Sequence, residues 1–158
     1  MMTIKTNRIG FVALIIAFMM QSCGVNTVYE QKVDFTSDSW NEDSIKTFSF
    51  EIAEDGDYDL FYLVKNKTDY PFSNLYIKYN LNNENSTVSN NLQEITLFDK
   101  KTGKPYGKGF GNVYESKFYS IRKINLKKGI YTLNTQQYMR TKELKGIMAF
   151  GISVEKSN

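Results

Sequence analysis

The chain has 158 residues, of which 41% are hydrophobic and 15% aromatic, enough to bury the core of one domain. Its 20 lysines and arginines slightly outnumber its 17 aspartates and glutamates, and it contains one cysteine and no histidine. This composition excludes a Ser-His-Asp triad, a histidine-ligated metal site and an intramolecular disulfide framework within the chain.

The first 22 residues have the organisation of a secretory signal peptide. Lys5 and Arg8 give a basic start, and residues 11–20 form an uncharged apolar run that is too short to span a bilayer as a helix. A small residue, Ser22, then precedes the only cysteine, Cys23, as in the lipobox of bacterial lipoproteins, although Met20 and Gln21 depart from its commonest form. The alternative is a transmembrane anchor with an unrelated cysteine.

The lipobox similarity implies cleavage before Cys23 and acylation of that residue. We therefore expect a signal peptide over 1–22, a lipidated tether over 23–28 and a single domain over 29–158, with the lipid on Cys23 as the only cofactor-like group. The membrane is then one partner of the chain. Nucleic acid is not an expected partner, because the basic residues at 5 and 8 leave with the signal peptide and little net charge remains.

After the tether, apolar runs alternate with turns rich in Asn, Asp and Gly. This pattern predicts strands over residues 47–53, 58–64, 75–81, 92–98, 118–126, 130–138 and 147–154. Residues 54–57 (Glu-Asp-Gly-Asp) predict a hairpin turn, and 99–111 a glycine-rich loop. With about eight strands in all, we expect an all-β, antiparallel β-sandwich of Ig-like or jelly-roll-like form, with Trp40 as a core plug at its edge.

Two segments are candidate contact surfaces. Tyr70-Pro71-Phe72 predicts a structured turn, which the proline allows to be cis, or an aromatic surface for a partner. Residues 107–111 (Gly-Lys-Gly-Phe-Gly) lack the Lys-Ser/Thr ending of a phosphate-binding loop, so we expect a conformationally demanding loop. The lysines of this region, Lys100, Lys101, Lys104 and Lys108, are either solvated or in contact with an acidic partner or lipid head groups.

The residues that we expect to contact a partner are Tyr70, Pro71, Phe72, Lys108 and Phe110. Arg140 could pair with a carboxylate across the sandwich, which we favour, or belong to an interface.

Catalysis would need two convergent carboxylates, as in a glycosidase. The chain offers Glu51, Asp55, Asp57, Asp59 and Asp69, but nothing in the sequence sets their separation, and such residues usually occupy turns and solvent faces. We therefore expect no catalytic residue, no metal site and no enzymatic activity.

The order of several segments resembles the gliding motility lipoprotein GldH family of Bacteroidetes. The segments that carry the resemblance are Ser22-Cys23, Trp40, Phe48–Ile52, Asp69–Tyr76, Gly107–Tyr114, Gln136 with Met139-Arg140, Leu144–Ile147 and Gly151–Lys156. The resemblance covers nearly all of the mature chain, and the Tyr-Pro segment and the glycine-rich loop in this order are specific together.

The resemblance implies a non-enzymatic, membrane-anchored lipoprotein of the cell envelope that serves the gliding apparatus and the linked type IX secretion system. Its partners would be other envelope proteins of that machinery. No run of acidic residues follows Cys23, so the sequence shows no obvious signal for export to the cell surface. We therefore expect an outer-membrane anchor that faces the periplasm. The alternative is a module that binds glycan or peptidoglycan through exposed aromatics such as Tyr76, Tyr106 and Tyr119.

Overall fold

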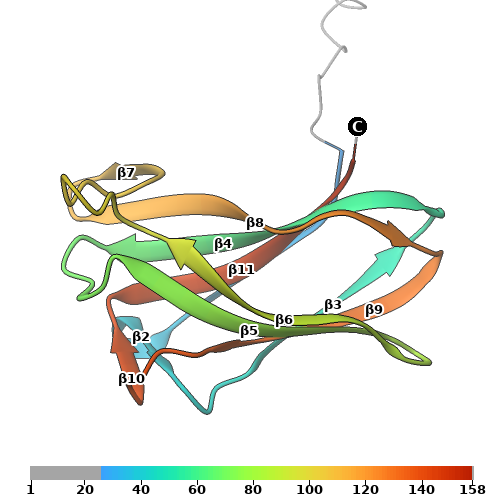
Figure 1. Ribbon diagram of the computed structural model, residues 1–158, viewed down its shortest axis with the longest axis horizontal. Helices are drawn as coiled ribbons and strands as arrows, with labels where there is room; N and C mark the ends of the chain where they lie inside the picture. Colours follow the sequence, from blue (N-terminus) through green and yellow to red (C-terminus); the bar gives the residue numbers. More distant parts are fainter. Residues whose placement is uncertain (1–25, 158) are drawn as a thin grey trace, which may run out of the picture.

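The computed structural model describes residues 26–157, which form two facing β-sheets and a short third sheet (Figure 1). The strands of this region are β1 (Thr27–Asp34), β2 (Ser39–Asn41), β3 (Lys46–Ile52), β4 (Gly56–Lys67), β5 (Asn74–Asn83), β6 (Thr87–Thr96), β7 (Lys108–Phe110), β8 (Val113–Leu126), β9 (Gly129–Gln137), β10 (Glu143–Lys145) and β11 (Ile147–Lys156). A 3-10 turn, η1 (Thr36–Asp38), links β1 to β2.

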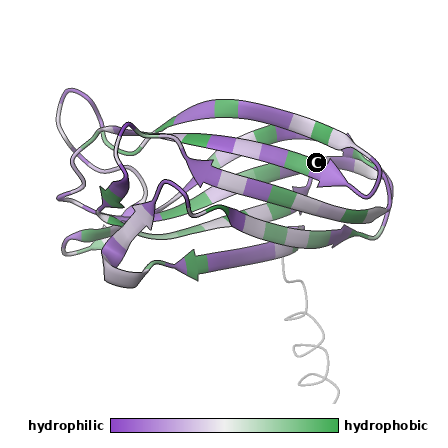
Figure 2. Ribbon diagram, turned by 90° about the horizontal axis from the view of Figure 1, so that it is seen from below, coloured by the Kyte–Doolittle hydropathy of each residue, from purple (hydrophilic) through white to green (hydrophobic). Residues whose placement is uncertain are grey.

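The two main sheets are antiparallel throughout. The five-stranded sheet has the order β1-β11-β4-β8-β7, and the four-stranded sheet has the order β3-β9-β5-β6. The short sheet pairs β10 with β2. Hydrophobic and hydrophilic residues alternate along the strands (Figure 2), as expected where one face of each sheet covers a core and the other meets solvent.

The strand pairing is that of one long hairpin wrapped around a core. β5 pairs with β6, and outward from this hairpin β4 pairs with β8, β3 with β9 and β1 with β11. Wrapping adds the pairs β4–β11 and β5–β9, which complete the sheets. This arrangement of eight long strands is a jelly roll, so the predicted all-β sandwich is confirmed and the structure selects its jelly-roll form.

Eleven strands are described against seven predicted ranges, and three of the four additional strands are short. β2, β7 and β10 each contain three residues, too few to show an alternation in the sequence. β1 is also absent from the predicted strands, because it lies at a sheet edge and only Tyr29 and Val33 are half-buried. It begins at Thr27, so the first strand starts within the predicted tether over 23–28.

The turn at residues 54–57 does not close a hairpin, so that prediction was wrong. β3 belongs to the four-stranded sheet and β4 to the five-stranded sheet, and the turn crosses between them. β4 is apolar on both faces and lies between β11 and β8, which leaves no free edge for β3. An Asp-Gly turn can close a hairpin or cross between two sheets. The position of β4 between β11 and β8 therefore determines which connection forms.

The sandwich has two distinct ends. Thr27 pairs with Glu155, Tyr58 with Lys156 and Gly56 with Leu126, so these residues lie together at the N-terminal end. At the opposite end, called the far end below, Lys67 pairs with Val113 and Asn66 with Ile147. The short sheet and the β7–β8 hairpin also lie at the far end (Figure 1).

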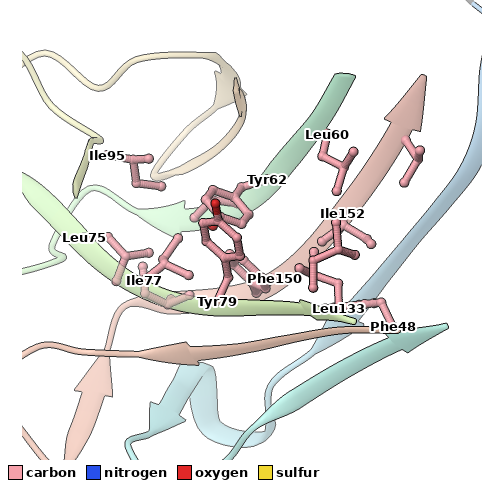
Figure 3. Packing of buried hydrophobic residues seen from close by; sticks show 14 of the residues in the cluster. Phe48, Leu60, Tyr62, Leu75, Ile77, Tyr79, Ile95, Leu133, Phe150 and Ile152 are labelled. Carbon is pink, nitrogen blue, oxygen red and sulfur yellow. The ribbon is translucent and has the colours of Figure 1, made fainter. Parts of the chain in front are cut away.

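The core is centred on Phe150 of β11. Its ring centroid lies 4.7 Å from that of Trp40 in the short sheet, 5.5 Å from Tyr62 in β4 and 6.3 Å from Phe48 in β3. All four side chains are fully buried. The indole nitrogen of Trp40 donates to the Ser44 carbonyl at 2.8 Å, which confirms Trp40 as a core residue with its polar atom satisfied. Figure 3 shows Phe150 and its apolar neighbours between the two sheets.

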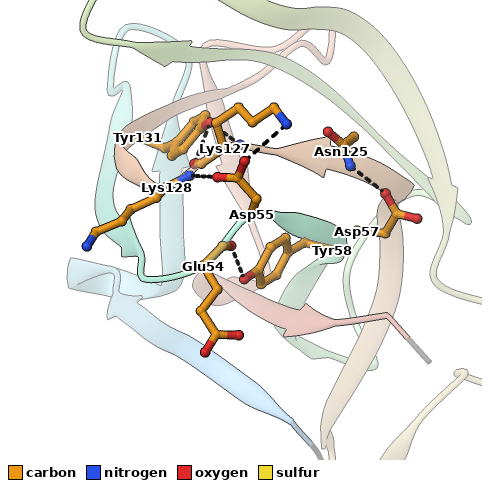
Figure 4. A network of polar contacts seen from close by, with 8 residues as sticks. All are labelled: Glu54, Asp55, Asp57, Tyr58, Asn125, Lys127, Lys128 and Tyr131. Atoms are coloured by element: carbon orange, nitrogen blue, oxygen red, sulfur yellow. Dashed lines mark hydrogen bonds and ion pairs between the residues drawn. The ribbon is translucent and has the colours of Figure 1, made fainter.

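The crossing turns at the N-terminal end are joined by a polar network (Figure 4). The Asp55 carboxylate accepts from the Lys128 backbone nitrogen at 2.8 Å and from the Lys127 ammonium at 3.1 Å. The Tyr131 hydroxyl bonds the main chain of Lys127 at 3.0 Å, and the Tyr58 hydroxyl donates to the Glu54 carbonyl at 2.8 Å. These bonds hold the β3–β4 and β8–β9 turns together.

We expect Phe150→Ala to lower the free energy of unfolding by about 3–5 kcal/mol, because it opens a cavity between all three sheets. Urea unfolding followed by fluorescence measures the change. Phe110→Ala is the matched control, since Phe110 is 96% exposed, and it should shift stability by no more than about 0.5 kcal/mol. Equal effects of the two substitutions would contradict this description of the core.

Asp55→Asn should lower stability at neutral pH and have little effect in acid. The Lys128 backbone N–H, followed by the Lys127 side chain, holds the pKa of Asp55 below its ordinary value. A lowered folded-state pKa contributes stability above the unfolded pKa of about 3.9, and this contribution is lost as pH falls through the folded pKa. Urea midpoints of wild type and variant, compared at about pH 7 and about pH 2.5, check this; a constant difference would argue against it.

Candidate functional site

The far end of the sandwich brings together the two segments that the sequence singles out. The backbone nitrogen of Thr68 donates to the Asn112 carbonyl at 2.9 Å, which places the β4–β5 loop (68–73) beside the β7–β8 turn. Leu97 and Phe98 donate to the Ser73 carbonyl and bring the segment after β6 to the same loop. The exposed residues here that the sequence predicts as contacts are Pro71, Phe72, Lys108 and Phe110, called the far-end surface below.

Tyr70 is the buried residue on which this surface packs. It is buried, its hydroxyl donates to the Asn74 carbonyl at 2.9 Å, and its ring stacks on Phe98 with centroids 6.3 Å apart. Burial raises the pKa of its phenol. Phe72 meets the Tyr70 ring edge-on at 5.7 Å and remains 40% exposed. The Tyr70–Pro71 peptide bond is trans, so the cis form that the sequence allowed is not adopted.

Gly146 is required by the burial of Tyr70. Its φ of +88° favours glycine, and a Cβ there would lie 2.9 Å from the Tyr70 Cα. The backbone of the β10–β11 connection therefore packs directly on the Tyr-Pro turn, which fixes the direction in which Pro71 and Phe72 project.

The glycine-rich segment is a tightly packed hairpin. A Cβ at Gly107 or Gly109 would lie 2.2 Å from a carbonyl oxygen of β8, and Gly111 has a φ of +64° in the turn. This confirms the predicted conformationally demanding loop. The segment opens a strand and not a helix, so it does not have the context of a phosphate-binding loop. At its tip Phe110 is 96% exposed, an unusual position for a large apolar side chain.

The loop before β7 carries uncompensated positive charge. Asp99 accepts from Thr102 through backbone and side chain and from the Lys101 backbone, and the Thr102 backbone bond is the main cause of its lowered pKa. The exposed lysines of this region, Lys100, Lys101, Lys104 and Lys108, form no ion pair within residues 26–157. The far end of the sandwich therefore exposes the apolar rings of Phe72 and Phe110 together with lysines that form no ion pair among the described residues.

Other candidate residues are dispersed. Tyr76 lies on β5 of the four-stranded sheet, Tyr119 on β8 of the five-stranded sheet and Tyr106 in the loop before β7, so they form no continuous aromatic row. Arg140 is exposed and forms no ion pair among the described residues, so the favoured structural pairing was wrong.

The candidate catalytic carboxylates serve turns and strand ends. Asp55 joins the crossing turns, Asp57 accepts from Asn125 at 3.0 Å and Asp59 accepts from the Lys123 backbone at 2.8 Å. Within residues 26–157 no group of three or more acidic or cysteine side chains could hold a metal ion. Cys23 and the predicted signal peptide lie outside the described residues.

The sequence interpretation missed a groove that begins beside Phe72. Its volume is about 510 Å³, and it is lined by Phe72, Tyr76, Leu92, Tyr138, Met139 and Arg140. Tyr138 and Leu92 are 56% and 45% exposed. Both were assigned to predicted strands, where an apolar residue counts as core, and only their exposure in the structure shows that they face outward.

Comparison with known proteins gives one family. The model of the GldH lipoprotein family matches residues 27–154. A protein of Christiangramia forsetii named gliding motility lipoprotein GldH homolog is 29% identical over 157 residues, covering 94% of this chain and 95% of its own. The gliding motility lipoprotein GldH of Flavobacterium johnsoniae is 26% identical, covering 99% of this chain and 100% of its own.

The similarity to solved structures is low. Eiger TNF from S. frugiperda aligns with a TM-score of 0.38 at 8% identity, covering 85% of this chain and 88% of its own. No helix among residues 26–157 has the length and apolar character needed to cross a membrane.

Proposed function

Because the chain belongs to the GldH lipoprotein family, as the match over residues 27–154 shows, we propose that it is a non-enzymatic component of the gliding and type IX secretion apparatus. In this proposal Cys23 carries the lipid that anchors the domain to the periplasmic face of the outer membrane. The far-end surface then contacts another envelope protein of the apparatus. The names of the two relatives, which align over nearly the whole chain, support the gliding assignment.

The observation that carries the proposal is that β1 begins at the N-terminal end of the sandwich, a few residues after Cys23. Between Cys23 and Thr27, where β1 begins, the chain can span at most about 14 Å. A lipid on Cys23 would therefore hold the N-terminal end of the sandwich close to the membrane. β4 runs from that end to the far end, and its twelve residues correspond to about 40 Å.

In the proposed arrangement, this distance favours one of the two interpretations of the basic loop. Charges on a membrane are screened over about 8 Å at physiological ionic strength, so lysines about 40 Å away do not sense the head groups of the anchoring membrane. The far-end surface faces away from that membrane. An acidic protein partner is consequently the better match for Lys108 and its neighbouring lysines.

Phe110 is the residue most suited to binding such a partner. Aromatic side chains, phenylalanine among them, are enriched in protein interfaces, and a few buried anchors carry most of the binding energy. A tight hairpin with close backbone packing at Gly107 and Gly109 holds Phe110 in place, so little entropy is lost when a partner covers it. The candidate carboxylates support the non-enzymatic part of the proposal, since none of them lines the two grooves of the four-stranded sheet.

Loss of the anchor should impair function without unfolding the domain. In the source bacterium, a deletion strain complemented with Cys23→Ala should show little gliding and little release of type IX cargo, and the protein should leave the membrane fraction. Wild type should restore both processes. Normal gliding and secretion in the deletion strain would contradict the proposal, as would full restoration by Cys23→Ala.

Phe110→Ala should reduce gliding while the protein remains folded and at its normal level. A hot-spot residue contributes about 2 kcal/mol or more, which corresponds to about a 30-fold weaker contact. Ile130→Ala is the matched control, because Ile130 is also an exposed apolar residue, at 53%, but lies at the start of β9 at the N-terminal end. Equal gliding of the two strains, scored as single-cell speed, would exclude Phe110 as the contact.

A further inference from the structure

The outer faces of the two sheets differ in chemistry. The five-stranded sheet carries a lattice of ion pairs, in which Lys32 lies 3.3 Å and Lys65 4.0 Å from Glu115, and Lys117 pairs with Glu155. The outward row at the middle of the four-stranded sheet is uncharged. It runs across β3, β9, β5 and β6 in register, and its residues are Thr47, Asn134, Asn80 and Asn90.

This row lies in a groove of about 800 Å³. The groove is lined by Ile45, Thr47, Lys78, Tyr79, Asn80, Asn90, Asn91, Leu92, Asn134, Thr135 and Gln136. Adjacent strands are about 4.8 Å apart, so the row presents an amide or hydroxyl group at that interval across the sheet. Lys78 is the one charged side chain among the lining residues, and apolar Ile45 and Leu92 are both exposed.

Asn80, at the centre of the row, has an unused acceptor. Its neighbour Asn134 accepts a hydrogen bond from the Thr47 hydroxyl at 2.8 Å, whereas the Asn80 Oδ1 is buried and has no hydrogen-bond partner in the described part of the chain. A buried acceptor without a donor destabilises the folded state. Rotation about the Cβ–Cγ bond of Asn80 would present this oxygen to a donor in the groove.

Aromatic side chains continue the groove toward the far end. Leu92 lines both the amide groove and the groove beside Phe72, so the two hollows meet at that residue. In the second hollow lie Tyr76 and Tyr138, and the Lys78 ammonium is 5.9 Å from the Tyr138 ring centroid. The amide groove thus offers mainly uncharged hydrogen-bonding groups, with Lys78 as its one charged residue, and the second hollow offers aromatic rings, with Arg140 as its one charged residue.

We infer that the outer face of the four-stranded sheet binds a neutral oligosaccharide. Sugar hydroxyls both donate and accept, as amides do, and the carbon face of a pyranose ring packs on tyrosine. A charged ligand would find only Lys78 to pair with in the amide groove. The second hollow reaches Phe72 of the far-end surface, whereas the amide groove contains no residue of that surface. The inference does not depend on the proposed role in gliding.

The test is a titration of the purified, lipidated protein in detergent with chitotetraose, cellotetraose and maltotetraose. Binding is measured by isothermal titration calorimetry and by the change in tyrosine fluorescence. We expect at least one tetrasaccharide to bind saturably. Asn80→Ala and Tyr138→Ala should each weaken it about tenfold, the effect of one lost contact of about 1.4 kcal/mol. Asn85→Ala, an exposed asparagine in the β5–β6 turn outside both hollows, is the matched control and should bind as wild type does.

Stability provides an independent readout. Asn80→Ala removes an unsatisfied acceptor, so its melting temperature should equal or exceed that of wild type while binding falls. The inference is overturned if none of the three tetrasaccharides binds, or if Asn80→Ala leaves binding unchanged. A self-association that Asn80→Ala abolishes, without sugar binding, would assign the face to a second copy of the chain and equally overturn it.

Discussion

The packing of Phe150 is the interaction on which the rest of the structure depends. This one side chain contacts aromatic rings from all three sheets, namely Trp40, Phe48 and Tyr62. β11, which carries it, is also the strand to which β1 is paired along its length. The strand that closes the core therefore also holds β1, the first strand of the described residues, in place. The position of β1 in turn defines the N-terminal end of the sandwich.

The two ends and the two outer faces are specialised differently around this core. At the N-terminal end, Asp55 and Tyr131 join the crossing turns through hydrogen bonds. The apolar side chain of Ile130 at this end is 53% exposed, compared with 96% for Phe110 at the far end. At the far end, buried Tyr70 and close-packed glycines hold exposed apolar and basic groups in fixed positions. Rigid loops of this kind, presented on a sheet scaffold, are typical of binding surfaces.

The sequence predicted the parts of the fold in which burial alternates. The alternating Phe48, Phe50 and Ile52 and the apolar run over 58–64 lie in predicted strands, and the structure has β3 and β4 there. An edge strand such as β1 buries too little to show a pattern. The connection at residues 54–57 was mispredicted because an Asp-Gly turn does not encode which sheet the next strand joins. That choice depends on contacts between residues far apart in the sequence.

The sequence predicted which segments form the candidate site, but not which of their residues are buried and which are exposed. Unusual local sequence marked the Tyr-Pro turn and the glycine hairpin, but only the structure shows that Tyr70 supports the surface while Phe72 and Phe110 form it. The groove at Tyr138 and Leu92 was hidden, because an apolar residue in a strand gives no sign of which face it occupies.

The central claim is that the far end points away from the anchoring membrane. It is tested most directly by attaching one fluorophore to the lipidated protein in vesicles that contain a lipid-bound quencher, either at position 127 at the N-terminal end or at position 108 at the far end. The account predicts strong quenching at 127 and none at 108. Quenching at 108 that equals or exceeds that at 127 would contradict it.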